Sequence, residues 1–367
     1  MDVYADGLVS GLSAVRPSWE ILQLRPQTRT HPKGQKLFRK LNRYYEQYWH
    51  YPQQIKRQAV DIFHIIDHSD GHIARWLKPL PIPTVVTCHD LINLRQPENA
   101  KHQAFLPALS SALWRYAVNG LRQADRLVTV SAHTAQDVNQ LLDISPQQLT
   151  VVHNAADPEF QRICKGEALS VLQEHHIPSD RFYLLNVGSS QPRKNIEAIL
   201  KVLAKLTAQP SEATTPSPHL IKAGAAFTAA QQTLIDSHNL HSYVTHIDKP
   251  DQATLIKLYN AADVLLAPSL YEGFGITILE AMACGTPVIT SNVSSLPEVA
   301  GNAAILIEPT QLDQIANAVR SLQQDPAQRQ ALIEKGLRHA QSFTWEKSAE
   351  QVAQLYETLT ASPRTQP

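Results

Sequence analysis

The chain has 367 residues, of which 43% are hydrophobic and 18% are charged, and its formal net charge at pH 7 is zero. This length is enough for two domains of ordinary size, and the neutral balance offers no global basic field to attract nucleic acid. Cys88, Cys164 and Cys284 are scattered without a CxxC pair, which excludes a disulfide framework and a zinc ribbon and favours a reducing cytoplasm.

The first half of the chain alternates predicted helices and strands. A helix is expected over Tyr4–Leu12 and a strand over Trp19–Leu24. Apolar stretches predict further strands within 61–68, 84–90, 124–131 and 150–158. Ser131 is expected to cap a helix over Thr134–Leu142. Because ligands of parallel sheets bind beyond the carboxyl ends of strands, His68, His89 and Asp90 lie where chemistry is expected.

A second series of strands and helices begins at Phe182. Strands are predicted over 182–188, 219–224, 243–247, 262–268 and 287–290, and helices over 196–207, 312–324, 328–342 and 345–360. Gln209–His219 is rich in Pro, Ser and Thr and is expected to form a mobile surface loop. Strands that alternate with helices throughout predict an α/β protein, with two parallel-sheet domains facing a cleft.

One stretch, 269–290, combines two carboxylates with a glycine pair. Glu272 and Glu280 stand eight positions apart, with Gly273 and Gly275 between them. The glycines can take backbone angles closed to other residues, and a short helix is predicted beyond them. The free N–H groups and the dipole at the start of that helix suit a phosphate or another anion. From the residues alone, a strand–loop–helix unit with two solvated glutamates remains an alternative.

A second candidate segment, 188–195, follows a predicted strand and opens a helix. It contains Gly188, Ser189 and the adjacent cations Arg193 and Lys194. The helix dipole disfavours cations at a helix start, so two of them together imply an anion nearby. The amides of this turn and the two cations can hold a diphosphate. The alternative is an Arg-Lys pair on the surface.

The stretch Ser-Leu-Tyr-Glu-Gly-Phe-Gly, followed by Glu-Ala-Met-Ala-Cys-Gly-Thr-Pro-Val-Ile, resembles the donor-sugar motif of the large retaining glycosyltransferase family 4. The resemblance covers nearly all of the chain except its start. It implies the GT-B architecture, with two Rossmann-like domains and a final helix that crosses back to the first. The expected divisions are an acceptor-binding domain at 1–165, a nucleotide-sugar domain at 166–344, the crossing helix at 345–360 and a tail at 361–367.

The resemblance assigns roles to the motif residues. Glu280 accepts hydrogen bonds from the ribose hydroxyls, and Glu272 contacts hydroxyls of the donor sugar. The amides of Gly273, Phe274, Gly275 and Ile276 face the phosphate and the sugar. These roles describe a site for a nucleotide-diphosphate sugar, which is a substrate rather than a cofactor. Metal is not expected, since no Asp-x-Asp triplet and no His-x3-His spacing is present.

His89 matches the histidine of the first domain that approaches the transferred sugar near the anomeric carbon, and Asp90 is expected to orient it. A structural role for a lone histidine at a strand end is the alternative. Lys194 matches the family's phosphate-binding lysine. Ser189 stands where the family has an arginine, so Arg193 is expected to substitute.

The family also implies that the anomeric configuration is retained. No carboxylate is evidently placed as a nucleophile, which favours a front-face attack, in which the leaving phosphate deprotonates the acceptor hydroxyl, over a double displacement. The transferred sugar is expected to be a hexose, with mannose as a candidate from the likeness to bacterial polysaccharide mannosyltransferases. The expected acceptor is a glycan, lipid-linked or part of a polysaccharide.

In the family, a strand and a Gly-x-Gly-x-Tyr-like turn precede the position of Tyr4. We therefore expect Met1 to be an internal residue of a chain that begins some tens of residues earlier. The alternative is a truncated domain, in which the loss of a central strand leaves sheet hydrogen bonds unpaired.

The segment Lys33–Arg57 is basic, and four tyrosines and Trp49 are interleaved with its charges or follow them. Such a pattern on a helix suggests contact with an anionic membrane surface or an anionic acceptor. Its alternative is a solvated helix with its aromatic residues packed inward. No apolar run approaches the length of a transmembrane helix, so any membrane attachment is expected to be peripheral, at the inner face.

Two further functions stay open from the sequence. A sugar-nucleotide epimerase uses the same two-domain fold but typically lacks the paired glutamates with Glu-Gly-Phe-Gly. A non-catalytic partner that binds a nucleotide sugar or a glycan is the other. A nucleic-acid role is poorly supported in a neutral chain.

Overall fold

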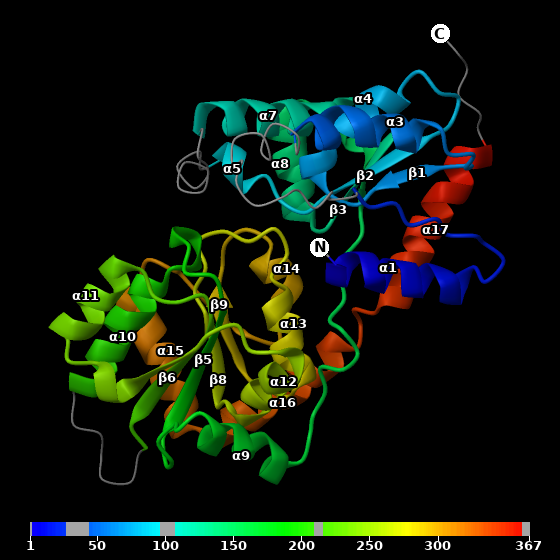
Figure 1. Ribbon diagram of the computed structural model, residues 1–367. Helices are drawn as coiled ribbons and strands as arrows, with labels where there is room; N and C mark the ends of the chain where they lie inside the picture. Colours follow the sequence, from blue (N-terminus) through cyan, green and yellow to red (C-terminus); the bar gives the residue numbers. More distant parts are fainter. Residues whose placement is uncertain (1, 27–43, 96–106, 209–215, 362–367) are drawn as a thin grey trace. The chain divides into compact units, whose positions relative to one another are not determined.

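The computed structural model describes residues 2–26, 44–95, 107–208 and 216–361. The chain divides into two compact units, shown in Figure 1. The first consists of Met1–His153 together with Trp345–Pro367, and the second is Asn154–Thr344. The division therefore falls at residue 154, before the boundary at 165 proposed from the sequence.

The first unit contains a parallel sheet with the strand order β1-β2-β3-β4. Its strands are β1 (Phe63–Ile65), β2 (Thr84–Cys88), β3 (Arg126–Thr129) and β4 (Leu149–Val151). All five residues of β2 are buried, as befits a strand covered on both faces. These strands confirm the four predicted within 61–158.

Helices cover this sheet. They are α3 (Tyr51–Lys56), α4 (His72–Leu77), α5 (Ile92–Arg95), α7 (Pro107–Asn119) and α8 (Ala132–Leu142), and a π-helical turn spans Glu46–His50. α3, α4 and α7 lie together on one side of the sheet (Figure 1). Ser131 caps α8 as predicted, because its Oγ accepts a 3.0 Å hydrogen bond from the amide of Thr134.

The first and last described helices pack against each other in this unit. They are α1 (Asp2–Val15) and α17 (Trp345–Ala361). Gly7 and Gly11, one turn apart on α1, permit the close approach: a Cβ on Gly7 would lie 2.2 Å from the indole of Trp345. Beyond α1, Arg16 bridges to α17 through carboxylate contacts of 2.9 Å with Glu350 and 2.7 Å with Glu357.

The strand predicted over Trp19–Leu24 is wrong. These residues form irregular backbone, with Leu22 53% and Leu24 38% exposed. A strand needs a neighbour for its backbone groups and a layer for its apolar face. The local alternation of residues does not reveal whether either is present.

The second unit contains a six-stranded parallel sheet with the order β10-β9-β8-β5-β6-β7. Its strands are β5 (Phe182–Gly188), β6 (Pro218–Gly224), β7 (Val244–Ile247), β8 (Val264–Ala267), β9 (Val288–Ser291) and β10 (Ile305–Ile307). The chain starts at β5, builds outward to β7, then returns to β8 and builds the other way. The order therefore reverses between β5 and β8, and ligands of such sheets bind beyond the carboxyl ends of strands at this point.

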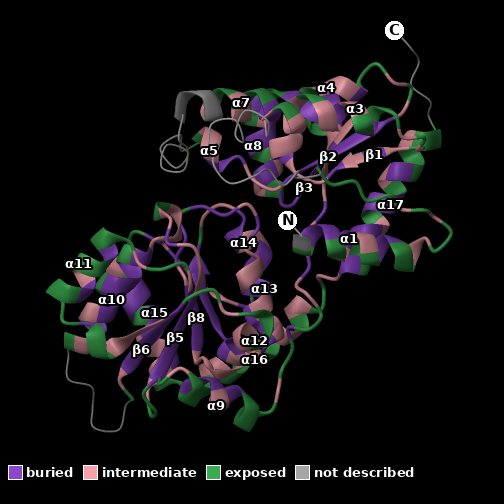
Figure 2. Cartoon of the chain, in the orientation of Figure 1, coloured by how far each residue is buried: buried purple, intermediate pink, exposed green. Residues whose placement is uncertain are grey.

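Helices cover both faces of this sheet. They are α9 (Lys165–Glu174), α10 (Ile196–Ala208), α11 (Ala229–Ser237), α12 (Gln252–Ala261), α13 (Ile276–Ala283), α14 (Leu296–Ala300), α15 (Leu312–Gln324) and α16 (Pro326–Ala340). α10, α11 and α15 lie on one face, and α12, α13 and α14 on the other (Figure 1). The strands between them are buried (Figure 2). Two parallel-sheet α/β units confirm the predicted fold class.

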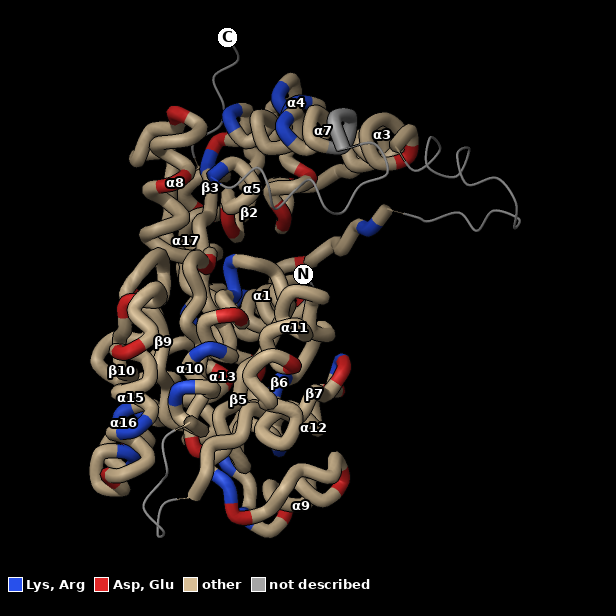
Figure 3. The backbone as a smooth tube through the Cα atoms, turned by 90° about the vertical axis from the view of Figure 1, so that its left-hand side faces the viewer, with Lys and Arg blue, Asp and Glu red and all other residues tan. Residues whose placement is uncertain are grey.

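Three segments with sequence expectations lie partly outside the described residues: 33–43 of the basic segment, 209–215 of the Pro-, Ser- and Thr-rich segment, and 362–367 of the predicted tail. Within the described chain, no helix combines the length and apolar character needed to cross a membrane. Figure 3 shows Lys and Arg interspersed with Asp and Glu along both units.

Candidate functional site

The site begins where β5 and β6 end side by side in two glycines. Gly188 has φ +128 and Gly224 has φ +110, a region of backbone conformation that favours glycine. A Cβ on Gly224 would lie 2.5 Å from the carbonyl oxygen of Gly188, and that carbonyl accepts a 3.2 Å hydrogen bond from the amide of Ala225. The two turns are thus held together by their backbones, with no room for a side chain between them.

The cations that follow Gly188 meet Glu272, which comes from the loop after β8. Arg193 Nη1 lies 2.7 Å from Glu272 Oε2, and Lys194 Nζ lies 2.6 Å from Glu272 Oε1. Ser269 donates a 2.8 Å hydrogen bond to the same Oε1. The structure therefore supplies the anion that two cations at a helix start require, and that anion is a carboxylate of the chain itself.

Glu272 is 8% exposed. Burial raises the pKa of its carboxyl, but the positive charges of Lys194 and Arg193 outweigh burial, and the pKa is lowered overall. The backbone of Glu272 is fixed as well, since its amide donates to Ser294 Oγ at 3.1 Å and its carbonyl accepts from Ser295 Oγ at 2.9 Å. Glu272 is an ionised carboxylate held in one place.

The second carboxylate of the motif, Glu280, lies in α13 and pairs with a tyrosine. The hydroxyl of Tyr259, a fully buried residue of α12, donates a 2.7 Å hydrogen bond to Glu280 Oε2. Burial raises the pKa of Glu280 to about 7, although the hydrogen bond from Tyr259 and the charge of Lys194 act to lower it. Glu280 thus changes charge near neutral pH. Tyr259 was not predicted from the sequence, because its hydrogen bond joins two different helices.

The loop between the two carboxylates turns sharply into α13. Gly275, the residue before the helix, has φ +99, and a Cβ there would lie 2.8 Å from a methyl group of Leu296. Phe274 is buried, and its carbonyl accepts a 2.9 Å hydrogen bond from Ser295 Oγ. The loop-to-helix geometry expected for Gly273, Phe274, Gly275 and Ile276 is therefore present, and their contacts with a ligand stay a prediction.

Two buried polar groups lie at the Gly188 turn, one from Ser189 within the turn and one from Lys222 on the neighbouring strand β6. The hydroxyl of Ser189 is buried and has no hydrogen-bond partner among the described residues. Lys222 on β6 is fully buried, and its ammonium donates to the carbonyl of Gly188 at 2.7 Å. Lys222 stands within an apolar strand with no motif around it, so no sequence pattern indicated its role. Buried polar atoms are normally satisfied, so an open hydroxyl in this turn is consistent with a ligand-binding site.

His89 and its neighbours belong to the first unit, at the carboxyl end of β2. A ring nitrogen of His89, Nε2, lies 2.9 Å from the carbonyl of Ile66 and donates to it. Burial lowers the pKa of His89, so the ring is neutral near pH 7. The expectation that Asp90 orients this ring is wrong, because the Asp90 carboxylate instead accepts a hydrogen bond from the amide of Ile92 at 3.1 Å.

The structure thus brings together most of the site residues proposed from the sequence. Gly188, Ser189, Arg193, Lys194 and the motif 272–280 gather in the second unit, at the point where its strand order reverses. His89 lies in the other unit. Within the described residues, no group of three or more His, Cys, Asp or Glu side chains is placed to hold a metal ion. Whether the reaction needs a metal stays a prediction.

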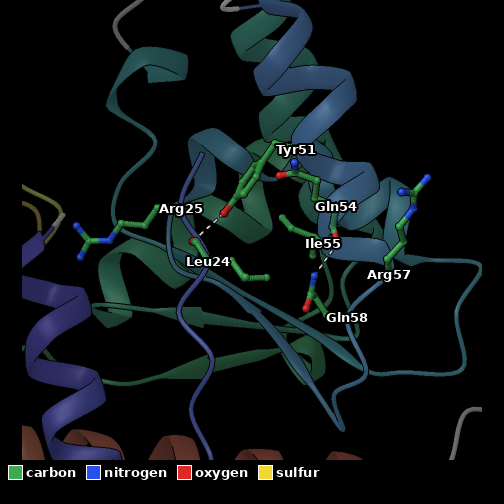
Figure 4. A pocket seen from close by; sticks show the side chains of 7 residues that line it. All are labelled: Leu24, Arg25, Tyr51, Gln54, Ile55, Arg57 and Gln58. Carbon is green, nitrogen blue, oxygen red and sulfur yellow. Dashed lines mark hydrogen bonds between the residues drawn. The ribbon is translucent and has the colours of Figure 1, made fainter. Parts of the chain in front are cut away.

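A separate pocket of about 350 Å³ lies in the first unit (Figure 4). Its lining joins the irregular segment after α1 to α3 and the residues that follow: Leu24, Arg25, Tyr51, Gln54, Ile55, Arg57 and Gln58. Tyr51 closes one side by donating a 2.7 Å hydrogen bond to the carbonyl of Leu24. The side chains of Arg25 and Arg57 point to opposite sides of it (Figure 4). None of the residues proposed from the sequence as catalytic or donor-binding lines this pocket.

Comparison with known families gives a match for each unit. The family model for glycosyltransferase family 4 matches residues 13–160, and the model for glycosyl transferases group 1 matches residues 170–339. Among solved structures, sucrose-phosphate synthase from Thermosynechococcus elongatus aligns with a TM-score of 0.75 at 23% identity, covering 98% of this chain and 93% of that one. This likeness concerns the fold, which is of the GT-B type.

Curated relatives include two from Escherichia coli. The O-antigen chain mannosyltransferase B is 30% identical over 240 residues, which is 65% of this chain and 62% of that protein. The serotype-specific mannosyltransferase WbdA is 29% identical over 302 residues, which is 79% of this chain and 36% of that protein. The chain therefore spans less than two thirds of the length of these relatives.

Proposed function

Since the chain belongs to glycosyltransferase family 4, we propose that it transfers a hexose from a nucleotide-diphosphate sugar to a glycan acceptor with retention of the anomeric configuration. The proposed donor sugar is mannose, from the two mannosyltransferases to which the chain is similar. The proposed acceptor is lipid-linked or part of a polysaccharide, since one relative acts on an O-antigen chain.

The observation that carries the proposal is the cluster of Arg193, Lys194 and Glu272 beside the Gly188 turn. Two cations and the free hydroxyl of Ser189 stand at the edge of the sheet where ligands of this architecture bind. A diphosphate placed there meets positive charge in a partly buried setting, where electrostatic stabilisation of a leaving group is strongest.

Donor binding rearranges this cluster. In the structure, the carboxylate of Glu272 holds both cations. An incoming diphosphate competes for Arg193 and Lys194, and it leaves Glu272 available to accept hydrogen bonds from hydroxyls of the donor sugar. Glu280 accepts from the ribose hydroxyls, with Tyr259 fixing one of its oxygens. The same three charged side chains thus pair with one another before the donor binds, and contact the donor afterwards.

Transfer then proceeds by front-face attack. The bond between the anomeric carbon and the phosphate oxygen breaks while the acceptor oxygen bonds to the same face of the sugar. The acceptor's proton passes to an oxygen of the leaving diphosphate. Glu272 is assigned to hydroxyls of the donor sugar, so no carboxylate is assigned the place of a nucleophile for a double displacement. His89 is neutral, and we assign it a contact near the anomeric carbon. Trapping a glycosyl-enzyme on Glu272 would overturn the front-face route.

The described part of the basic aromatic segment supports peripheral contact with an anionic membrane. Tyr45 and Trp49 are 53% and 51% exposed, and Tyr116 of the neighbouring α7 is 45% exposed. Lys56 and Arg57 are exposed at the end of α3. Aromatic side chains beside cations suit the interface of an anionic bilayer. Binding of the chain to vesicles with and without anionic lipid tests the contact, and replacing Trp49 by Ser is expected to weaken it.

The donor assignment is tested by thermal shift with GDP, UDP and ADP and their sugar conjugates. A ligand at a hundred times its dissociation constant stabilises the native state by about 2.7 kcal/mol. We expect one nucleotide series to raise the melting temperature, and Arg193→Met or Lys194→Met to reduce the shift for the diphosphate but not for the nucleoside. Product analysis with the matching sugar nucleotide, with and without a glycan acceptor, then separates transfer from epimerisation.

A further inference from the structure

The second unit contains a buried cation that the proposed function does not use. Lys222 is fully buried in β6, and its ammonium donates to three backbone carbonyls: Gly188 at 2.7 Å, Ala225 at 3.3 Å and Ala223 at 3.4 Å. Among the described residues it has no carboxylate partner. Lysines are almost never fully buried unless they are paired, so this ammonium calls for an explanation.

The ammonium of Lys222 lies directly beside the Gly188 turn. The ammonium of Lys222 donates a hydrogen bond to the carbonyl of Gly188. The ammonium of Lys194 lies close to the same glycine, since a Cβ built on Gly188 would be 3.6 Å from its Nζ. The two like charges on either side of this glycine therefore repel each other, and Glu272 pairs with only one of them, Lys194. An anion bound at the Gly188 turn offsets that repulsion.

We infer that Lys222 is a positioning residue for the donor diphosphate, holding the Gly188 turn in shape and placing a buried positive charge beneath it. The inference rests on the proposed function, because it needs a nucleoside diphosphate to bind at this turn. Neighbouring side chains support the same framework. Ser190 Oγ donates to the carbonyl of Ala225 at 3.1 Å, and the side-chain Nε2 of Gln231 donates to the carbonyl of Ser190 at 3.3 Å.

The groups around Lys222 make its protonation sensitive to an anion. Burial lowers its pKa to about 8, and the charge of Lys194 contributes. Its register neighbours are Asn186 on β5 and His246 on β7, and the ring of His246 donates to the carbonyl of Gly224 at 2.8 Å. α10 and α11, which pack nearby, present buried apolar side chains and the neutral amide of Gln231. A bound diphosphate is thus the anion expected to raise the pKa of Lys222 and favour its charged form.

The test is calorimetric titration of the whole chain with GDP, UDP and ADP at pH 8, in buffers of different ionisation enthalpy. A bound diphosphate favours the charged ammonium, so the nucleotide that binds should take up a measurable fraction of a proton at this pH. The corresponding nucleoside, which lacks the diphosphate, should take up none through Lys222. A merely structural lysine would not produce this difference.

Three variants sharpen the result. Lys222→Met is expected to weaken nucleotide binding roughly tenfold and to abolish the uptake. Lys222→Arg keeps a charge that cannot dissociate, so it should bind without uptake. Lys201→Met, on the exposed side of α10, is the matched control and should behave as the wild type.

The outcomes separate this inference from the proposed function. If none of the three nucleotides binds, both are overturned. If a nucleotide binds the wild type without proton uptake, or with the same uptake in Lys222→Met, only the role of Lys222 is overturned. The absence of proton uptake by the wild type overturns the role of Lys222 even where a variant does not fold.

Discussion

The hydroxyl of Tyr259 and the carboxylate of Glu280 are joined by a hydrogen bond of 2.7 Å between α12 and α13. The tyrosine is fully buried, and burial raises the pKa of its hydroxyl well above the usual value, so it remains a donor at every relevant pH. Its partner has a pKa of about 7. The protonation state of one carboxylate near neutrality thus depends on a neighbour with no ligand contact assigned to it.

Replacing Tyr259 by Phe should shift the pH dependence of donor binding. The hydrogen bond lowers the pKa of Glu280, so its loss raises that pKa. In the proposed role of Glu280, the charged carboxylate accepts the ribose hydroxyls. Affinity should therefore rise with pH through the pKa, and this rise should move to higher pH in the variant. We expect roughly tenfold weaker binding at pH 7, with recovery toward pH 8.

Nucleotide affinity measured from pH 6 to 8 checks this. Tyr183→Phe is the control, because that hydroxyl donates to the carbonyl of Pro178. Superimposable profiles for wild type and Tyr259→Phe would refute the coupling.

Replacing Glu272 by Gln should separate catalysis from nucleotide binding. The change removes the anion that holds Arg193 and Lys194 while keeping the shape of the side chain. Both cations are then free for a diphosphate, so we expect nucleoside diphosphate to bind at least as tightly as in the wild type. Sugar transfer should fall about a hundredfold or more, because the negative charge proposed to accept hydrogen bonds from the sugar hydroxyls is lost.

Calorimetry with the nucleotide and product assays with the sugar nucleotide measure the two effects on the same variant. A parallel loss of nucleotide affinity and activity would show that Glu272 does not compete with the diphosphate for these cations.

Gly224→Ala should destabilise the second unit. The glycine has φ +110, and the added Cβ would meet the carbonyl oxygen of Gly188 at 2.5 Å. Strain of this kind costs about 1–3 kcal/mol, before the cost of moving the Gly188 turn. Urea denaturation gives the change in the free energy of unfolding.

The matched control is Gly166→Ala in α9, where a Cβ meets nothing within 4 Å. Alanine favours a helix there, so this variant should gain up to about 1 kcal/mol. Equal effects at the two positions would rule out the steric explanation.

His64 should make the first unit acid-sensitive. Its ring nitrogens are both engaged, with the hydroxyl of Tyr356 at Nδ1 and that of Thr87 at Nε2. Burial, with a smaller contribution from His89, lowers the pKa of His64 to about 3. A depressed pKa gives stability that is complete above the unfolded value near 6.5 and is lost as the pH falls toward 3. At pH 5 the loss is about 2 kcal/mol.

Tryptophan fluorescence reports this unit selectively, because all five tryptophans of the sequence belong to it. The non-titrating variant His64→Gln should show a shallower decline of melting temperature between pH 7 and 5. A decline as steep as that of the wild type would mean that other groups set the acid response.

Some long periodic segments were predicted with their correct bounds. β5 and α15 have the predicted bounds, since seven- and thirteen-residue patterns carry a clear period. β10 and α14, with three and five residues, are too short to show one, and they were missed. Trp19–Leu24 has a strand-like composition, but pairing is a property of the neighbours rather than of the segment.

The site was predictable where its residues are close in sequence. The glycine turn and the two glutamates each form a local pattern, and the structure brings them together. Tyr259 and Lys222 were missed because their roles depend on which helix lies beside α13 and on the register between β5 and β6. The sequence predicted that an anion lies near Arg193. It did not show that this anion is Glu272, because Glu272 lies far along the chain.

The pairing of α1 with α17 has a consequence for biosynthesis. The second unit is one continuous segment, Asn154–Thr344, so all of its core emerges from the ribosome before the last helix does. The first unit begins earlier but cannot cover the face of α1 around Gly7 and Gly11 until Trp345 and the residues after it have been translated. The domain made first is therefore finished last, and it depends on chaperones or on its own solubility while the other folds.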